Sequence, residues 1–263
     1  MRLKSTIPVV ILGVPIPDSD NPFLVVPVAS AIVEVEFSKC SNPSLAYEGI
    51  GGIGGLLESF WFNLSRGLAL SLCPKLTLAK VDGVNKPPMG GLYATLTSSL
   101  LYSLHRLHGD VPQVLDIVET SSLVDLVHVD RAWRLALEAL RYSSISGKPV
   151  AYRGPLEVYE FEGFGSVRVD VGDHVGNVRS LISREELGSS VYGALIHLMG
   201  EVVLEASMRV RDGARIEDVV RIFKYIHDGV TLSTYGLKPR SESCLWSPGL
   251  PWAFDEVCLV NRG

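Results

Sequence analysis

Several helices predicted from this sequence follow one another without a strand between them, and this order constrains the fold more than any other feature. Two β-branched runs bounded by Pro, Asp and Asn come first, at Pro8–Leu12 and Phe23–Val26, and Ser30–Phe37 then alternates between apolar and acidic residues, so three strands are expected. From residue 92 to residue 142 the pattern is then helical with no strand between. A parallel sheet needs a crossover, usually one helix, between consecutive strands. The sequence therefore predicts an α+β fold and not an alternating parallel sheet.

The rest of the chain continues this mixture of helices and strands. Helices are expected at Leu56–Leu72, Leu92–His108, Val111–Tyr142 with a break near Thr120–Ser122, Gly188–Val210 and Ile216–Asp228. Further strands are expected at Lys75–Val81, Val150–Phe161, Ser166–Val171, Val230–Tyr235, Ser243–Trp246 and Val257–Val260. No low-complexity linker or repeat is found. We expect two lobes, residues 1–172 and 173–263, with a cleft between them.

Composition indicates a folded protein and counts against one class of partner. The chain has 263 residues, 47% of them apolar, and a mean hydropathy of +0.25, which is enough to close a sizeable core. Its 24 basic and 29 acidic residues give a net charge of -5. Proteins that bind the phosphate backbone usually carry a cationic excess. The charge balance therefore disfavours nucleic acid as a partner.

The four cysteines show no pairing signal in the sequence. Cys40, Cys73, Cys244 and Cys258 are scattered, with no C-x-x-C pair. This spacing argues against a zinc site and against a disulfide framework. The sequence therefore predicts four reduced thiols and a cytoplasmic protein.

The apolar runs near the N-terminus are interrupted. Pro8, Pro15 and Pro27 divide them, so none reaches the roughly 20 residues of a membrane span. The start imitates a signal peptide, but Asp18 and Asp20 break its apolar segment. We therefore expect no membrane span and read this region as part of the fold.

Two glycine-rich segments each precede a predicted helix. One is Gly90-Gly91, and the other has five glycines between residues 49 and 55. Unpaired N–H groups and the helix dipole favour anions at a helix N-terminus, and glycines permit close approach of a phosphate. Either segment can instead simply form a turn, because neither matches the common nucleotide-binding motifs. The sequence leaves both readings open.

The segment Pro87–Thr95 resembles the P-x-G-x-G-L-G-S-S-A phosphate loop of the GHMP kinase superfamily, which includes galactokinase, homoserine kinase and mevalonate kinase. The order of flanking elements agrees over nearly the whole chain, and Ser146-Gly147 resembles the start of the family's S-G-x-D segment. The resemblance implies a two-lobed fold, with a ribosomal-protein-like N-terminal lobe and a ferredoxin-like C-terminal lobe. It also implies ATP-dependent phosphotransfer to a small metabolite with Mg²⁺, placing Gly90, Gly91 and Thr95 at the phosphates.

The sequence also departs from the family pattern. Tyr93 stands where the family has glycine, and a tyrosine there would crowd a phosphate. Lys148-Pro149 replaces the segment that carries the family's aspartate. The expected glycine-rich loop near the C-terminus retains only Gly249. A catalytically inactive GHMP-fold protein that serves in binding or assembly is therefore the alternative, because function depends on the site and not on the fold.

Basic residues in and after the segment Ser146–Pro149, which lacks the family's aspartate, are candidates for holding a phosphorylated ligand. Lys148 and Arg153 flank a predicted strand and are the candidate catalytic residues, because fixed cations stabilise phosphate charge. Solvated loop charges are the competing reading. His105 and His108 lie three residues apart on a helix, but two ligands do not make a metal site, so none is predicted. The expected partners are a small metabolite and a second copy of the chain in a homodimer.

Overall fold

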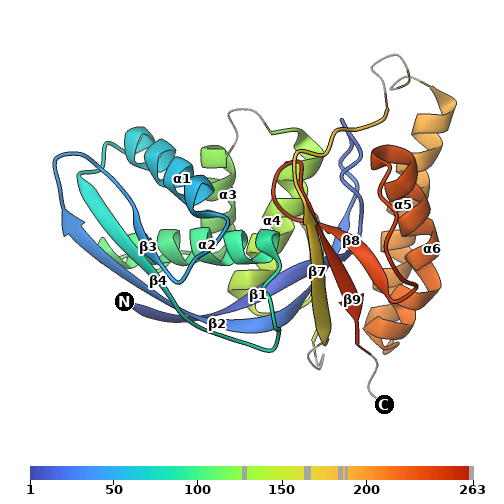
Figure 1. The fold of residues 1–263 in the computed structure, drawn as a ribbon, viewed down its shortest axis with the longest axis horizontal. Helices are drawn as coiled ribbons and strands as arrows, with labels where there is room; N and C mark the ends of the chain where they lie inside the picture. The colour runs from blue at the N-terminus through green and yellow to red at the C-terminus, as the bar shows by residue number, and fades with distance from the viewer. Residues whose placement is uncertain (126–128, 163–166, 183–185, 187–188, 261–263) are drawn as a thin grey trace.

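The protein contains two β-sheets whose strands are mainly antiparallel (Figure 1). The computed structural model describes residues 1–125, 129–162, 167–182, 186 and 189–260. The larger sheet contains β1 (Arg2–Leu12), β2 (Phe23–Lys39), β3 (Ala46–Glu48), β4 (Leu72–Asp82), β5 (Val150–Gly154) and β6 (Glu157–Glu160). Its order is β3-β4-β2-β5-β6, with β1 paired to β2. The smaller sheet has the order β7-β9-β8, from β7 (Val169–Val175), β8 (Cys244–Pro248) and β9 (Phe254–Leu259).

Helices form one layer on the large sheet and a pair beside the small one (Figure 1). The layer contains α1 (Gly54–Gly67), α2 (Met89–Leu107), α3 (Val114–Asp125) and α4 (Arg131–Ser146). The pair is α5 (Ser190–Arg211) and α6 (Ile216–Tyr235). The α+β class is thus confirmed. The fully buried Trp133 of α4 contacts Tyr235, Trp252 and Phe254 edge-on or tilted, and so joins the helix layer to the C-terminal elements.

Prolines bend the first hairpin without ending it. The sequence suggests two separate runs before and after Pro27, but β2 is a single strand of 17 residues. Pro8 and Pro27 lie opposite each other, where the β1–β2 register shifts. Proline lacks an N–H to donate, so a local irregularity accommodates it.

One predicted helix end, one predicted break and one predicted strand are wrong. The first helix ends at Gly67, and Leu72 begins β4. Helix α3 continues through Thr120–Ser122 to Asp125, so no break lies there. Helix α4 begins at Arg131, where the Asp130 side chain caps it by accepting from the Ala132 N–H at 2.8 Å. The predicted strand 230–235 is the last part of α6. There Thr231 donates to the His227 carbonyl oxygen at 2.8 Å. The β-branched Val230, Thr231 and Thr234 lie on the buried face of this helix. Residues 166 and 188, where two predicted elements begin, lie outside the described residues.

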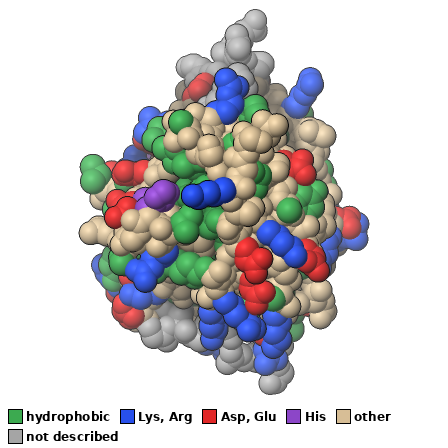
Figure 2. Space-filling model, turned by 90° about the vertical axis from the view of Figure 1, so that its left-hand side faces the viewer, with side chains coloured by type: hydrophobic (Ala, Val, Ile, Leu, Met, Phe, Trp, Pro, Cys, Tyr) green, Lys and Arg blue, Asp and Glu red, His purple; other side chains and the backbone are tan. Residues whose placement is uncertain are grey.

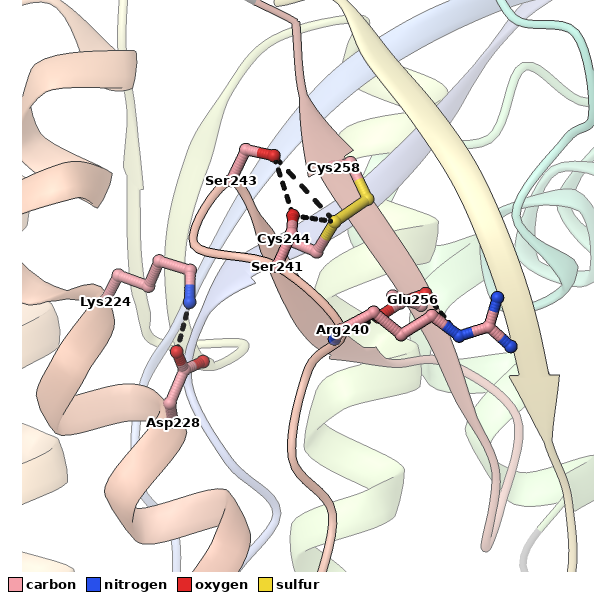
Figure 3. Close-up of a disulfide and its surroundings, with 8 residues drawn as sticks. All are labelled: Lys224, Asp228, Arg240, Ser241, Ser243, Cys244, Glu256 and Cys258. Carbon is pink, nitrogen blue, oxygen red and sulfur yellow. Dashed lines mark hydrogen bonds and ion pairs between the residues drawn. A yellow bond between two sulfur atoms is a disulfide. The ribbon is translucent and has the colours of Figure 1, made fainter.

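The prediction of four reduced thiols is also wrong. Disulfides join Cys40 to Cys73 and Cys244 to Cys258, and Figure 3 shows the second, which bridges β8 and β9. Strand pairing is the cause. The end of β2 pairs with the start of β4, and Cys244 lies directly opposite Cys258. Because pairing between distant strands is invisible in the spacing, the cysteine argument for a cytoplasmic location fails.

Two further expectations concern the C-terminal half. The expected lobe boundary at residues 172 and 173 falls within β7, which pairs with β9. By length and composition one described helix, α5, could cross a membrane, although the proline-broken runs near the N-terminus predicted no span. In the fold, α5 packs against α6 and contacts β2 and β5.

Candidate functional site at the start of helix α2

The segment that resembles a phosphate loop is helical. Helix α2 begins at Met89, and its N-cap residue, Pro88, makes no side-chain hydrogen bond to the first turn. Gly90, Gly91 and Thr95 therefore belong to the first two turns of a buried helix. The geometry around each of them decides what the helix start can bind.

Gly90 faces the turn between β8 and β9. Its N–H donates to Asp255 Oδ2 at 3.2 Å, and Asp255 is only 3% exposed. A Cβ on Gly90 would lie 2.1 Å from the Cα of Gly249, so glycine is required for this close approach. An anionic group is favoured at a helix N-terminus. Here the chain supplies that group itself, as the Asp255 carboxylate.

Gly91 and Thr95 face β1. A Cβ on Gly91 would lie 2.0 Å from the carbonyl oxygen of Pro8. Thr95 is fully buried, and its hydroxyl lies 2.8 Å from the Thr6 carbonyl oxygen and 2.7 Å from that of Gly91. Ser144 donates a further hydrogen bond to Thr95 or to Thr6. These contacts fix α2 onto the sheet.

Tyr93 points into the helix layer. Its hydroxyl donates to Asp125 Oδ1 at 2.9 Å, and Arg141 lies 5.7 Å from its ring centroid. Arg141 also pairs with Asp125 at 2.5 Å. Burial, followed by the nearby Asp125 charge, raises the pKa of Tyr93 well above its ordinary value. The side chain is thus engaged within the core and does not crowd the helix start in the way the sequence suggested.

The side chain of Asp255 also contacts a partly exposed histidine. His174 Nδ1 lies 2.9 Å from Asp255 Oδ1, and its side chain is 27% exposed. Sequence reasoning missed both residues. Two consecutive acids within the apolar strand β9, Asp255 and Glu256, were the available signal, because buried carboxylates need partners.

Basic groups near this site are already engaged. Arg240 pairs with Asp173, and its backbone N–H donates to the buried Glu256 at 2.8 Å (Figure 3 shows Arg240 and Glu256). Lys86, on the loop before α2, donates to the carbonyl oxygen of Gly172 at 3.4 Å. The Lys86 and Asp255 contacts thus tie the small sheet to the start of α2.

Lys148 and Arg153 lie in the region of the β5–β6 hairpin. Lys148 Nζ pairs with Glu160 at 2.6 Å and Glu162 at 2.7 Å, and these hydrogen bonds raise its pKa. Arg153 pairs with Glu157 at 3.2 Å and contacts Asp20. Within the described residues, no hydrogen bond or ion pair links either cation to the start of α2. The structure thus does not bring the predicted cations and glycines together.

The second glycine-rich segment packs beside the same helix start. Gly49 and Gly52 have positive φ angles of 74° and 78°. A Cβ on Gly52 would lie 2.5 Å from the methyl carbon of Met89, and one on Gly49 would lie 2.8 Å from the Leu78 carbonyl oxygen. These glycines therefore serve a tight turn against α2 and β4.

A phosphate of ATP does not fit at the Gly90 N–H. The Gly90 N–H is already bonded to a carboxylate, which would repel a phosphate at that position. Among the described residues, no group of three or more His, Cys, Asp or Glu side chains could hold a metal ion. Both cofactors rest on the resemblance alone.

Comparison with solved structures finds proteins of similar fold, among them mevalonate and phosphomevalonate kinases. The L. major mevalonate kinase in complex with R-mevalonate aligns with a TM-score of 0.63 at 11% identity, over 100% of this chain and 88% of that one. The Methanococcus jannaschii mevalonate kinase gives 0.60 at 10% identity, over 99% and 90%. The Streptococcus pneumoniae phosphomevalonate kinase in complex with phosphomevalonate and AMPPNP gives 0.59 at 11% identity, over 99% and 93%.

Sequence comparison adds no closer relative. No family model matches the chain, and no curated protein matches it either. At identities of about a tenth, structural likeness speaks to architecture and leaves the site open. The chain thus shares the fold of the mevalonate-related members of the GHMP superfamily, and this likeness concerns the fold alone.

Proposed function

We propose that this chain is a GHMP-fold binding or assembly protein that does not transfer phosphate from ATP. The observation that carries the proposal is the buried Asp255 carboxylate, which accepts the Gly90 N–H at the start of α2. Phosphoryl transfer depends almost entirely on positioning and on stabilising negative charge. A fixed carboxylate at the position of the phosphates opposes both.

The other departures from the kinase pattern support the same proposal. The segment Lys148-Pro149 carries no aspartate to accept a proton. Lys148 and Arg153 have carboxylate partners within the chain, which reduces their use to an incoming phosphate. No single change excludes turnover, but the changes affect cofactor binding, proton transfer and charge stabilisation together.

Assembly is favoured by the outer helices. Large apolar side chains that are 42% to 70% exposed lie on α5 and α6: Val191, Leu198, Leu204, Met208, Ile222, Tyr225 and Leu232. At the opposite end of the molecule, acidic and basic side chains lie among the apolar ones (Figure 2). Large exposed apolar patches mark interaction sites. We infer that α5 and α6 contact a second copy of the chain.

Thermal unfolding with Mg-ATP tests the absence of nucleotide binding. A ligand present at 100 times its Kd stabilises a protein by about 2.7 kcal/mol, which raises the Tm of a domain of this size by about 5 °C or more. We expect no rise. A clear rise, together with turnover near 1 per second on homoserine, mevalonate, phosphomevalonate or a simple sugar, would refute the proposal.

A further inference from the structure

A polar cavity of about 260 Å³ lies farther along α2, on the face of the helix that also carries Gly91 and Thr95. The start of β1, the middle of α2 and the end of α4 converge on it. Its described lining residues are Leu3, Lys4, Ser5, Ser98, Ser99, Tyr102, Ser144 and Ile145. Hydroxyl groups thus dominate the lining, and none of these residues is acidic.

One of these hydroxyls has no partner. Ser98 is only 3% exposed, and its Oγ makes no hydrogen bond within the described part of the chain. A buried hydroxyl without a partner is costly, and such groups normally bond to protein, water or a ligand. A serine hydroxyl in a helix can donate to a backbone carbonyl oxygen of the preceding turn, as Ser121 does to Ile117. Ser98, which lines the cavity, makes no such hydrogen bond.

Neighbouring hydroxyls have donor capacity to spare. Ser5 and Ser99 lie 3.1 Å apart and share one hydrogen bond, so one of their two hydroxyl hydrogens remains free. Ser144 is satisfied by donation to Thr6 or Thr95. With Ser98, the cavity therefore offers at least two hydroxyl donors that the protein does not use.

The charge at the cavity decides which ligand these donors suit. Lys4 is exposed and makes no ion pair within the described residues. An unpaired lysine beside a hydroxyl-lined cavity matches a tetrahedral oxyanion, since charge-assisted hydrogen bonds are the strong ones. A neutral polyol would leave the lysine charge without a counterpart.

We propose that this cavity binds a phosphate group, held by Lys4 and by the hydroxyls of Ser98, Ser5 and Ser99. The proposal does not rest on the absence of kinase activity, because it uses a different part of α2. Inorganic phosphate and a phosphate monoester share the required chemistry. The cavity admits either as a free ion or as the head of a larger molecule.

Calorimetric titration of the full chain with inorganic phosphate, in chloride buffer of matched ionic strength, tests the site. We expect saturable binding with a Kd of about 1 mM or tighter, weakened about tenfold in Ser98→Ala and in Lys4→Gln. A parallel titration with glycerol 2-phosphate identifies the source. Tighter binding of the ester assigns a phosphorylated molecule, and binding of the inorganic ion alone assigns the free anion.

Matched controls separate the cavity from general effects. Ser103 lies on the same helix, is equally buried and also has an unpartnered hydroxyl, but it does not line the cavity. Ser103→Ala and the exposed Lys39→Gln should bind phosphate as the wild type does. No binding by the wild type overturns the proposal. Equal weakening in both serine variants overturns it too, as does full affinity in Lys4→Gln.

Discussion

At the residue scale, Gly91 shows how one motif fits two physical explanations. Read as a phosphate loop, Gly91 keeps the backbone open for a ligand, and substitution should remove binding while the fold survives. In the structure, the space beside Gly91 is filled by the backbone of β1, at the Pro8 carbonyl. A strand backbone cannot rotate away as a flexible side chain can. The glycine therefore serves packing between α2 and β1.

Gly91→Val should destabilise the fold. Forcing a side chain into a packed core costs about 1–3 kcal/mol and sometimes more, and a backbone neighbour places this site at the upper end. Urea unfolding measures the change. Gly55→Val is the control, because nothing lies within 4 Å of a Cβ at Gly55. Equal stability of Gly91→Val and the wild type would contradict the packing role.

Tyr93 provides a prediction in alkaline solution. Burial raises its pKa in the folded protein, so the unfolded chain releases this proton first, at about pH 10. Stability is therefore intact below pH 10 and falls as the pH rises above it, by up to about 1.4 kcal/mol per pH unit for one tyrosine. Tyr93→Phe should reduce that slope in unfolding measurements between pH 9.5 and 11. An unchanged slope would show that the Tyr93 hydroxyl ionises freely in the fold.

At the element scale, much of the fold is predictable from the sequence because strands and amphipathic helices leave a local period. Alternation in residues 30–37 indicated the central part of β2, and spaced leucines indicated α2. The end of α6 was missed because its β-branched residues are typical of a strand, although here they pack inside a helix. Pairing between strands leaves no local period, so the disulfides were missed as well.

The two disulfides therefore test the strand pairing. We expect no thiol to react after denaturation without reductant, and four to react after reduction. In the chain-entropy relation, a closed loop of about 34 residues contributes about 4 kcal/mol and one of about 15 residues about 3 kcal/mol, from separations of 33 and 14 residues. Reduction of both should accordingly lower the Tm by about 15 °C or more. Four reactive thiols without reductant would contradict the pairing.

At the scale of the whole molecule, the candidate site could not be assembled from the sequence. Gly90 and Asp255 are separated by 165 residues and meet only because the β8–β9 turn docks on α2. Sequence reasoning found the glycines through a motif, but the acid that faces them belongs to no motif. The likeness to the L. major mevalonate kinase covers 100% of this chain at 11% identity, so it concerns the architecture and leaves the site residues open.

Self-association through α5 and α6 is the prediction that concerns the whole protein. Leu204 and Met208 lie one turn apart on α5 and are 52% and 45% exposed. Burying such a patch in a second copy removes apolar surface from water, and charged side chains placed there oppose it. Light scattering should therefore give a dimer for the wild type and a monomer for the Leu204→Glu, Met208→Glu double variant. Leu123→Glu, on the exposed face of α3, is the control and should remain dimeric. A wild-type protein that stays monomeric at 100 μM, about the Kd range of weak association, would exclude this surface as a dimer contact.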